Sequence, residues 1–146
     1  MTRGWYLSYS FNSTLSYRLP VRRLAEIVVA RGFLDRPDYE ALLDRADVVV
    51  SAAKGENFGI AVVEAVAAGA WPVLPGTLAY PEIIPVSHHD ECLYAEGQLG
   101  KRLAEVVARI AAGASAPGGL AEAMAVHAWP VTAERMDRRL DELLRR

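Results

Sequence analysis

The sequence predicts an α/β protein in which helices cover both faces of a parallel sheet. Two observations support this prediction. First, short apolar runs alternate with stretches that have the apolar spacing of helices, which is typical of parallel sheets. Second, the run "DVVVSAA" is apolar at consecutive positions, as expected of a strand that is buried on both faces. The length of 146 residues, with 52% hydrophobic and 23% charged residues, suits one folded domain.

The first 25 residues have no clean hydrophobic period. The stretch "GWYLSYSFNSTLSYR" combines serines and aromatics and is compatible with a strand, a loop or a disordered start. We therefore treat residues 1–25 as an atypical N-terminal segment and residues 26–146 as the folded domain. The first element of that domain is expected in "EIVVARGFL" (26–34), whose β-branched run predicts a strand that ends near Arg31 and Gly32.

A helix, a strand and a second helix are expected next. "DRPDYEALLDRAD" has helical apolar spacing, with Asp35 placed to cap the helix and Pro37 in its first turn. The buried strand is expected over Val48–Ser51, and a helix over residues 59–68 follows it. Gly69 is placed to end that helix in a left-handed conformation.

Two more strands and three helices complete the prediction. "WPVLP" is a short strand, but Pro72 donates no ladder hydrogen bond, which counts against a central position and suits only the start of the strand. "ECLYAE" is a third candidate strand, in which Cys92 is expected to be a small core residue. The helices are expected over residues 98–112, 120–127 and 132–146, with Thr132 as the N-cap of the last.

The clearest functional signal lies where the strand Val48–Ser51 ends. Ligands of such sheets bind outside the carboxyl ends of the strands. Phe58, Gly59 and Ile60 begin the following helix, so their backbone N–H groups are expected to be unpaired within the helix and to point outward. Together with the helix dipole they would form an anion site. Gly59 has no side chain, which would let a ligand approach the backbone closely.

A second loop is expected at the same edge of the sheet. The strand "WPVLP" ends there, and the loop that follows it contains Gly76 and Thr77. The two loops are therefore predicted to converge on one cleft, because parallel strands share their carboxyl edge.

Glu64 is the lone carboxylate in a helix otherwise made of small and apolar residues. Burying an unpaired carboxylate costs several kcal/mol, so this side chain must face water, an internal partner or a ligand with hydroxyls. Glu56 lies eight residues earlier, a rise of roughly 12 Å if the segment is helical throughout. Glycosidase carboxylates are only about 5–9.5 Å apart. The two glutamates are therefore better placed to bind two parts of one long polar ligand, such as a nucleotide sugar.

The pattern Glu56, seven residues, Glu64 within "ENFGIAVVEAVAAG" resembles the donor-binding signature of retaining glycosyltransferases of the GT-B fold, family 4 type. More narrowly, residues 26–95, with "LAYPEIIP" followed by "CLY", resemble the tRNA-queuosine α-mannosyltransferases and their bacterial relatives. The resemblance implies a Rossmann-like sheet that forms a partial C-terminal lobe of the GT-B fold. It also implies that a complete enzyme needs an acceptor-binding N-terminal lobe, which we expect to be missing from this chain.

The resemblance implies a role for each matching residue. Glu56 would contact the donor hexose, which makes it the candidate catalytic residue. The backbone amides of Phe58, Gly59 and Ile60 would contact hexose and phosphate oxygens. Glu64 would accept hydrogen bonds from the ribose hydroxyls.

The loop with Gly76 and Thr77 would line the donor or the acceptor side of the same cleft. The resemblance implies GDP-mannose as donor, transfer with retention, and queuosine of tRNA as the acceptor. No Asp-x-Asp triplet is present, so neither a metal nor another cofactor is expected. Three alternatives remain: a non-catalytic nucleotide-sugar-binding domain or truncated, inactive fragment, a sugar-nucleotide epimerase, and a tRNA-binding module without chemistry.

Composition narrows the remaining classes of function. The formal net charge is −2, which gives no strong attraction to nucleic acid or membrane surfaces. The sequence has one cysteine, no apolar run of about 18 residues and no signal-peptide pattern, so a cytoplasmic location without membrane contact is expected. His88 and His89 are adjacent and lack a third ligand, so they are expected in a solvated loop and not in a metal site.

Overall fold

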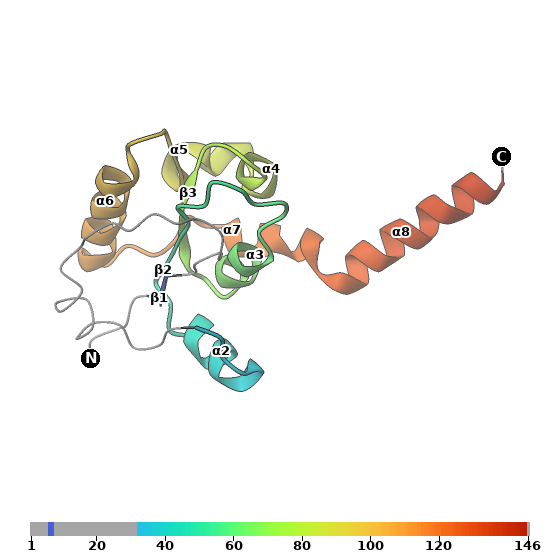
Figure 1. Cartoon of the computed structure of the whole chain (residues 1–146), viewed down its shortest axis with the longest axis horizontal. Coiled ribbons are helices and arrows are strands. Elements are labelled where there is room, and N and C mark those ends of the chain that lie inside the picture. The colour runs from blue at the N-terminus through green and yellow to red at the C-terminus, as the bar shows by residue number, and fades with distance from the viewer. Residues whose placement is uncertain (1–5, 8–31, 146) are drawn as a thin grey trace.

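A four-stranded parallel sheet forms the centre of the molecule (Figure 1). The computed structural model describes residues 6–7 and 32–145. The strands lie in the order β1-β2-β3-β4, and their bounds are β1 (Tyr6–Leu7), β2 (Val48–Val50), β3 (Trp71–Pro75) and β4 (Leu93–Tyr94). Each neighbouring pair is parallel, with Val49 opposite Pro72 and Leu74 opposite Leu93. The predicted α/β class and parallel sheet are confirmed.

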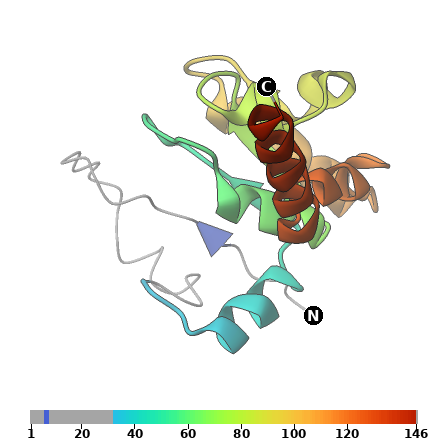
Figure 2. The ribbon, with the colours of Figure 1, turned by 90° about the vertical axis from the view of Figure 1, so that its right-hand side faces the viewer.

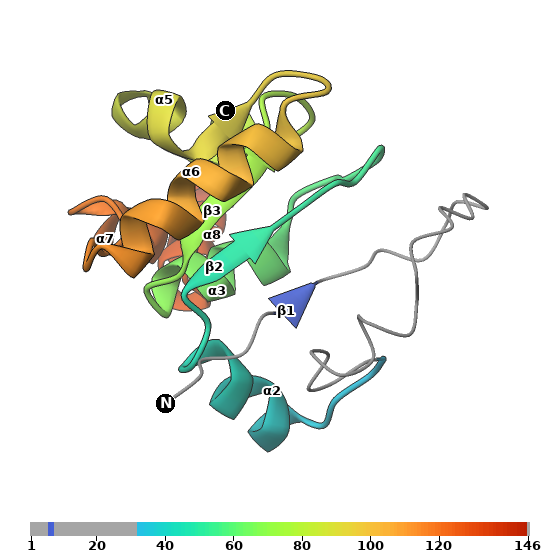
Figure 3. The same cartoon turned by 90° about the vertical axis from the view of Figure 1, so that its left-hand side faces the viewer.

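Helices lie on both faces of this sheet. Their bounds are α2 (Arg36–Leu43), α3 (Ile60–Ala67), α4 (Tyr80–Ile83), η1 (Val86–His88), α5 (His89–Cys92), α6 (Leu99–Ala111), α7 (Leu120–Ala123), η2 (Met124–His127) and α8 (Trp129–Leu144). Helix α2 lies beside α3 (Figures 1 and 2). Helices α3 and α6 lie on opposite sides of the sheet (Figure 3).

The core is centred on β3, where Trp71, Val73 and Leu74 are almost completely buried. From α3, Val62, Ala65 and Val66 face the core, and from α6, Val106 does. Full burial of a side chain of this size contributes about 1.5–3 kcal/mol. The tightly packed β3 therefore fixes where its carboxyl end, and the loop that follows it, must lie.

Most elements begin and end where the sequence places them. Asp35 caps α2 by accepting a hydrogen bond from the N–H of Asp38 (3.1 Å), and Gly69 follows α3 with a φ of 99°. The predicted segment 1–25 and the predicted strand in 26–34 lie mainly outside the described residues. They are therefore not tested, apart from β1 and residues 32–34.

The position of β3 corrects the expectation for Pro72. The strand is central, between β2 and β4, and Pro72 is its second residue. The N–H of Trp71 points to β2, where it donates to Asp47 O (2.9 Å), so the nitrogen of Pro72 faces the other side by alternation. On that side β4 begins only at Leu93, opposite Leu74. No ladder hydrogen bond is lost at Pro72, because its partner strand has not yet begun.

Two other element boundaries also differ from the prediction. Only Leu93–Tyr94 of "ECLYAE" is a strand, because only the last two residues of β3 pair with it. Cys92 is instead the last residue of α5. The last helix begins at Trp129, so Thr132 is not its N-cap. The N–H of Thr132 donates to Ala128 O (3.0 Å), one turn inside the helix. Pro130 stands in the first turn, where its fixed φ and missing N–H are tolerated.

Helix α8 extends away from the sheet (Figure 1). None of its described residues is buried, and Met136, Leu140 and Leu143 are each more than half exposed. Within the described part of the chain, every helix is too short or too polar to cross a membrane.

The thiol of Cys92 is buried, and burial raises its pKa from 9.0 to about 12. The folded protein therefore holds the thiol protonated, and this preference stabilises the fold below pH 9 and is lost as the pH rises towards 12. We predict that iodoacetamide at pH 8 alkylates native Cys92 roughly 1000-fold more slowly than the denatured chain, which a three-unit pKa difference gives. Mass spectrometry over time measures this cleanly, because the chain has one cysteine. Equal rates would show that the thiol is accessible.

Candidate functional site

The loop after β2 (residues 51–59) and the loop after β3 (residues 76–79) leave the same edge of the sheet. A buried hydrogen-bond network joins them. Ser51 Oγ lies 2.7 Å from Tyr80 Oη, Tyr94 Oη donates to Ser51 O (2.8 Å), and the N–H of Gly76 donates to Tyr94 O (2.8 Å). The ends of β2, β3 and β4 and the start of α4 therefore meet at one point. The two loops therefore begin at one edge as predicted, and the cleft between them stays a prediction.

The hydroxyls of this network stay neutral. Burial raises the pKa of Tyr80, the hydrogen bond from Ser51 lowers it, and the charge of Glu56 raises it again. Burial likewise raises the pKa of Tyr94. Both phenols therefore remain protonated at neutral pH. Tyr94 donates to Ser51 O, and Tyr80 shares a hydrogen bond with Ser51 Oγ, and these contacts hold the edge together.

The carboxylate of Glu56 occupies the anion site that the sequence predicts at the start of α3. Its Oε1 accepts hydrogen bonds from the N–H groups of Asn57 (3.0 Å), Phe58 (3.3 Å) and Gly59 (3.0 Å). As expected, the N–H groups of Phe58 and Gly59 are not paired within α3, but in this structure they bind Glu56. The cause is the flexible glutamate side chain, which folds back onto the helix start that precedes Ile60. For the Ile60 N–H, the described residues supply no acceptor.

Gly59 is needed for packing as well as for its backbone. Its φ of 84° is left-handed, a conformation that costs other residues about 1–2 kcal/mol. A Cβ at this position would lie 3.3 Å from both Tyr80 Cε1 and Ile83 Cδ1. Side chains of α4 therefore fill the space beside Gly59 through which a ligand was expected to approach the backbone.

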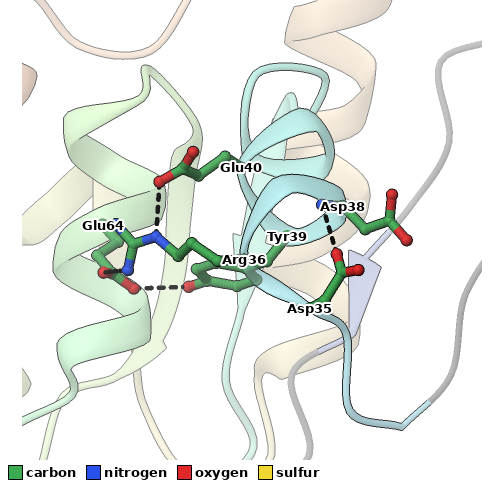
Figure 4. Close-up of polar contacts among 6 residues, drawn as sticks. All are labelled: Asp35, Arg36, Asp38, Tyr39, Glu40 and Glu64. Carbon is green, nitrogen blue, oxygen red and sulfur yellow. Dashed lines mark hydrogen bonds and ion pairs between the residues drawn. The ribbon is translucent and has the colours of Figure 1, made fainter.

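Glu64 has internal partners, which come from α2 (Figure 4). Tyr39 Oη donates to Glu64 Oε2 at 2.8 Å, and Arg36 Nη1 lies 3.6 Å from Glu64 Oε1. Arg36 Nε also donates to Glu40 Oε1 (2.6 Å). The Glu64 side chain is 33% exposed. Of the three explanations for this carboxylate, the structure provides the internal partner, so no ligand is needed to account for it. Its ribose role stays a prediction that depends on the resemblance.

The remaining predicted residues lie on the surface of the two loops. The ring of Phe58 is 43% exposed and meets the ring of His127 edge-on, with centroids 5.4 Å apart. Thr77 is exposed, and a Cβ on Gly76 would lie 3.4 Å from Tyr94 O. A donor could thus reach Phe58 and Thr77 without disturbing the core.

His89 does not lie in a solvated loop as expected. It begins α5, and its Nε2 lies 2.8 Å from Ile84 O and 3.2 Å from Pro81 O, where it holds the end of α4. Across the described residues no three His, Cys, Asp or Glu side chains are grouped to hold a metal ion.

Sequence reasoning missed the tyrosines that organise this site. The sequence patterns indicated no polar role for Tyr39, in the predicted helix after Asp35, or for Tyr80, in the loop after the strand "WPVLP". Both make polar contacts with residues at least 25 positions away. The signal for the contact between Tyr39 and Glu64 is a tyrosine on one predicted helix and a lone glutamate on the next.

The chain matches the family model described as glycosyl transferases group 1 over residues 13–113. It is also similar to a tRNA-queuosine alpha-mannosyltransferase of Drosophila melanogaster, with 41% identity over 63 residues. That similarity covers 43% of this chain and 17% of the relative. The chain thus corresponds to a small part of the length of that relative.

We predict that Gly59→Ala lowers the free energy of unfolding by roughly 2–5 kcal/mol, the sum of left-handed strain and crowding against α4. Gly69→Ala is the matched control, because Gly69 has a φ of 99° but no atom within 4 Å of the added Cβ. It should cost only the strain, about 1–2 kcal/mol. Urea denaturation of both variants measures the difference. Equal losses would contradict the packing of Tyr80 and Ile83 against Gly59.

Proposed function

The chain belongs to the group 1 glycosyl transferases, and we propose that its sheet edge binds a nucleoside-diphosphate sugar for hexose transfer. The observation that carries the proposal is the placement of one glutamate directly before helix α3 and of another within it. Glu56 lies on the N-terminus of α3 and Glu64 lies one turn further along its surface. Helix α3 starts at the carboxyl edge of the sheet, where ligands of parallel sheets bind.

We propose GDP-mannose as the donor and queuosine in tRNA as the acceptor. The name of the Drosophila relative supports mannose and a tRNA acceptor, and the motif resemblance supports the guanine base. Because this chain spans 17% of that relative, the acceptor contacts are assigned to no residue of the chain.

In this proposal the donor replaces Glu56 as the hydrogen-bond partner of the N–H groups at the start of α3. The N–H groups that now bind Glu56 would turn to the hexose and phosphate oxygens, and the freed carboxylate would meet the hexose. During transfer the bond between the anomeric carbon and the diphosphate oxygen breaks, and its electron pair leaves with the diphosphate. The amides at the start of α3 stabilise the added negative charge. The acceptor hydroxyl gives its proton to the departing diphosphate oxygen and forms the new bond on the face that the diphosphate leaves, which retains the configuration.

Titration calorimetry of the 146-residue chain with GDP, UDP and ADP tests the proposal. We expect GDP to bind most tightly, and we expect Glu64→Gln to weaken GDP binding by about 10-fold or more, since hydrogen bonds to a charged group are lost. Glu40→Gln is the control, because Glu40 also pairs with Arg36, but within α2 and without a contact to Glu64.

Two results would contradict this function. One is the absence of binding by any of the three nucleotides. The other is GDP affinity that is unchanged in Glu64→Gln while the variant remains folded by circular dichroism. Binding of GDP-mannose without its hydrolysis or transfer, even with acceptor tRNA present, would instead favour a non-catalytic nucleotide-sugar-binding domain.

A further inference from the structure

Tyr39 of helix α2 donates a hydrogen bond to Glu64, the carboxylate that the proposed function assigns to the ribose. The hydrogen bond from Tyr39 Oη to Glu64 Oε2 (2.8 Å) joins α2 to α3 across 25 residues of sequence (Figure 4). Tyr39 is half-buried, and its ring packs against the hydrophobic core. Its hydroxyl is therefore held in place by packing, independently of Glu64.

The contact leaves room for a ligand on the same carboxylate. An ionised carboxylate has about four acceptor positions on its two oxygens. Tyr39 uses one of them, on Oε2, and Arg36 lies 3.6 Å from Oε1, beyond a normal hydrogen bond. The side chain is one-third exposed, so hydroxyl donors can reach the remaining positions.

We propose that Tyr39 is a positioning residue, which orients the Glu64 carboxylate for the two ribose hydroxyls of the donor. This inference rests on the proposed function. A free glutamate side chain populates many rotamers, and a ligand that fixes it loses affinity for that reason. Tyr39 fixes Glu64 before the donor arrives. Arg36 is less suited to this task, because it is mostly exposed and its Nε is bound to Glu40.

A positioning role and a purely structural role predict different ligand responses. If Tyr39 only joins α2 to α3, its loss acts on every ligand of the site alike. If it orients Glu64, its loss affects only those ligands that carry the ribose hydroxyls. The readout is therefore the affinity ratio between GDP and 2′,3′-dideoxy-GDP, in the wild-type chain and in each variant.

The experiment compares four proteins by calorimetry: wild type, Tyr39→Phe, Glu64→Gln and the double variant. Tyr39→Phe keeps the ring, so the packing of α2 is preserved, and thermal unfolding checks this. We expect Tyr39→Phe to lower the preference for GDP by about 2- to 10-fold, the cost of ordering one flexible side chain, with dideoxy-GDP binding unchanged. The double variant should bind GDP no more weakly than Glu64→Gln alone. Glu40→Gln should keep the wild-type ratio.

Several outcomes would overturn the inference. Equal weakening of both nucleotides in Tyr39→Phe assigns Tyr39 a structural role, and wild-type affinity for both nucleotides assigns it none. A wild-type chain that binds both nucleotides equally well removes the ribose contact of Glu64 and with it the role of Tyr39, while donor binding stands. A wild-type chain that binds neither nucleotide overturns the proposed function as well.

Discussion

The hydrogen bond between Ser51 and Tyr80 is the contact on which the edge of the sheet depends. It brings the end of β2 against the start of α4, and through Tyr94 it connects to the ends of β3 and β4. These groups are buried, so a broken contact would leave a buried polar group unpaired, at a cost of about 1–3 kcal/mol. The loops of the candidate site are therefore held at a fixed separation by neutral hydroxyls, and no charge or metal ion is needed to hold them.

Both glutamates of the proposed donor site are already satisfied within the protein. Glu56 binds three amides at the start of α3, and Glu64 binds Tyr39 and lies beside Arg36. Among the described residues, neither of these two carboxylates is therefore left unpaired. A donor must replace the contacts of Glu56, so its affinity reflects a difference between two sets of hydrogen bonds. It can share Glu64 with Tyr39, because a carboxylate accepts several bonds at once.

Local sequence patterns predicted the elements whose cause is local. The apolar run at β2, the helix after it and the left-handed Gly69 all follow from neighbouring residues. The central position of Pro72 could not be predicted, because it depends on where β4 begins, 21 residues later. The contacts of the candidate site could not be predicted for a similar reason. The motif indicated Glu56 and Glu64, but the partners of Glu64 lie on another helix. Side chains of α4 also fill the space beside Gly59 where a Cβ would lie.

Helix α3 explains why so short a segment can hold a long ligand in the proposed function. Its rise from Ile60 to Glu64 is about 6 Å, which separates the amides at its start from the carboxylate on its surface. Neither end of this spacing is free to change, because Tyr80 of α4 packs against Gly59 and Tyr39 of α2 binds Glu64. The helix alone is only eight residues long, too short to be stable in isolation. The neighbouring tyrosines thus turn a marginal helix into a rigid spacer with a hydrogen-bonding group at each end.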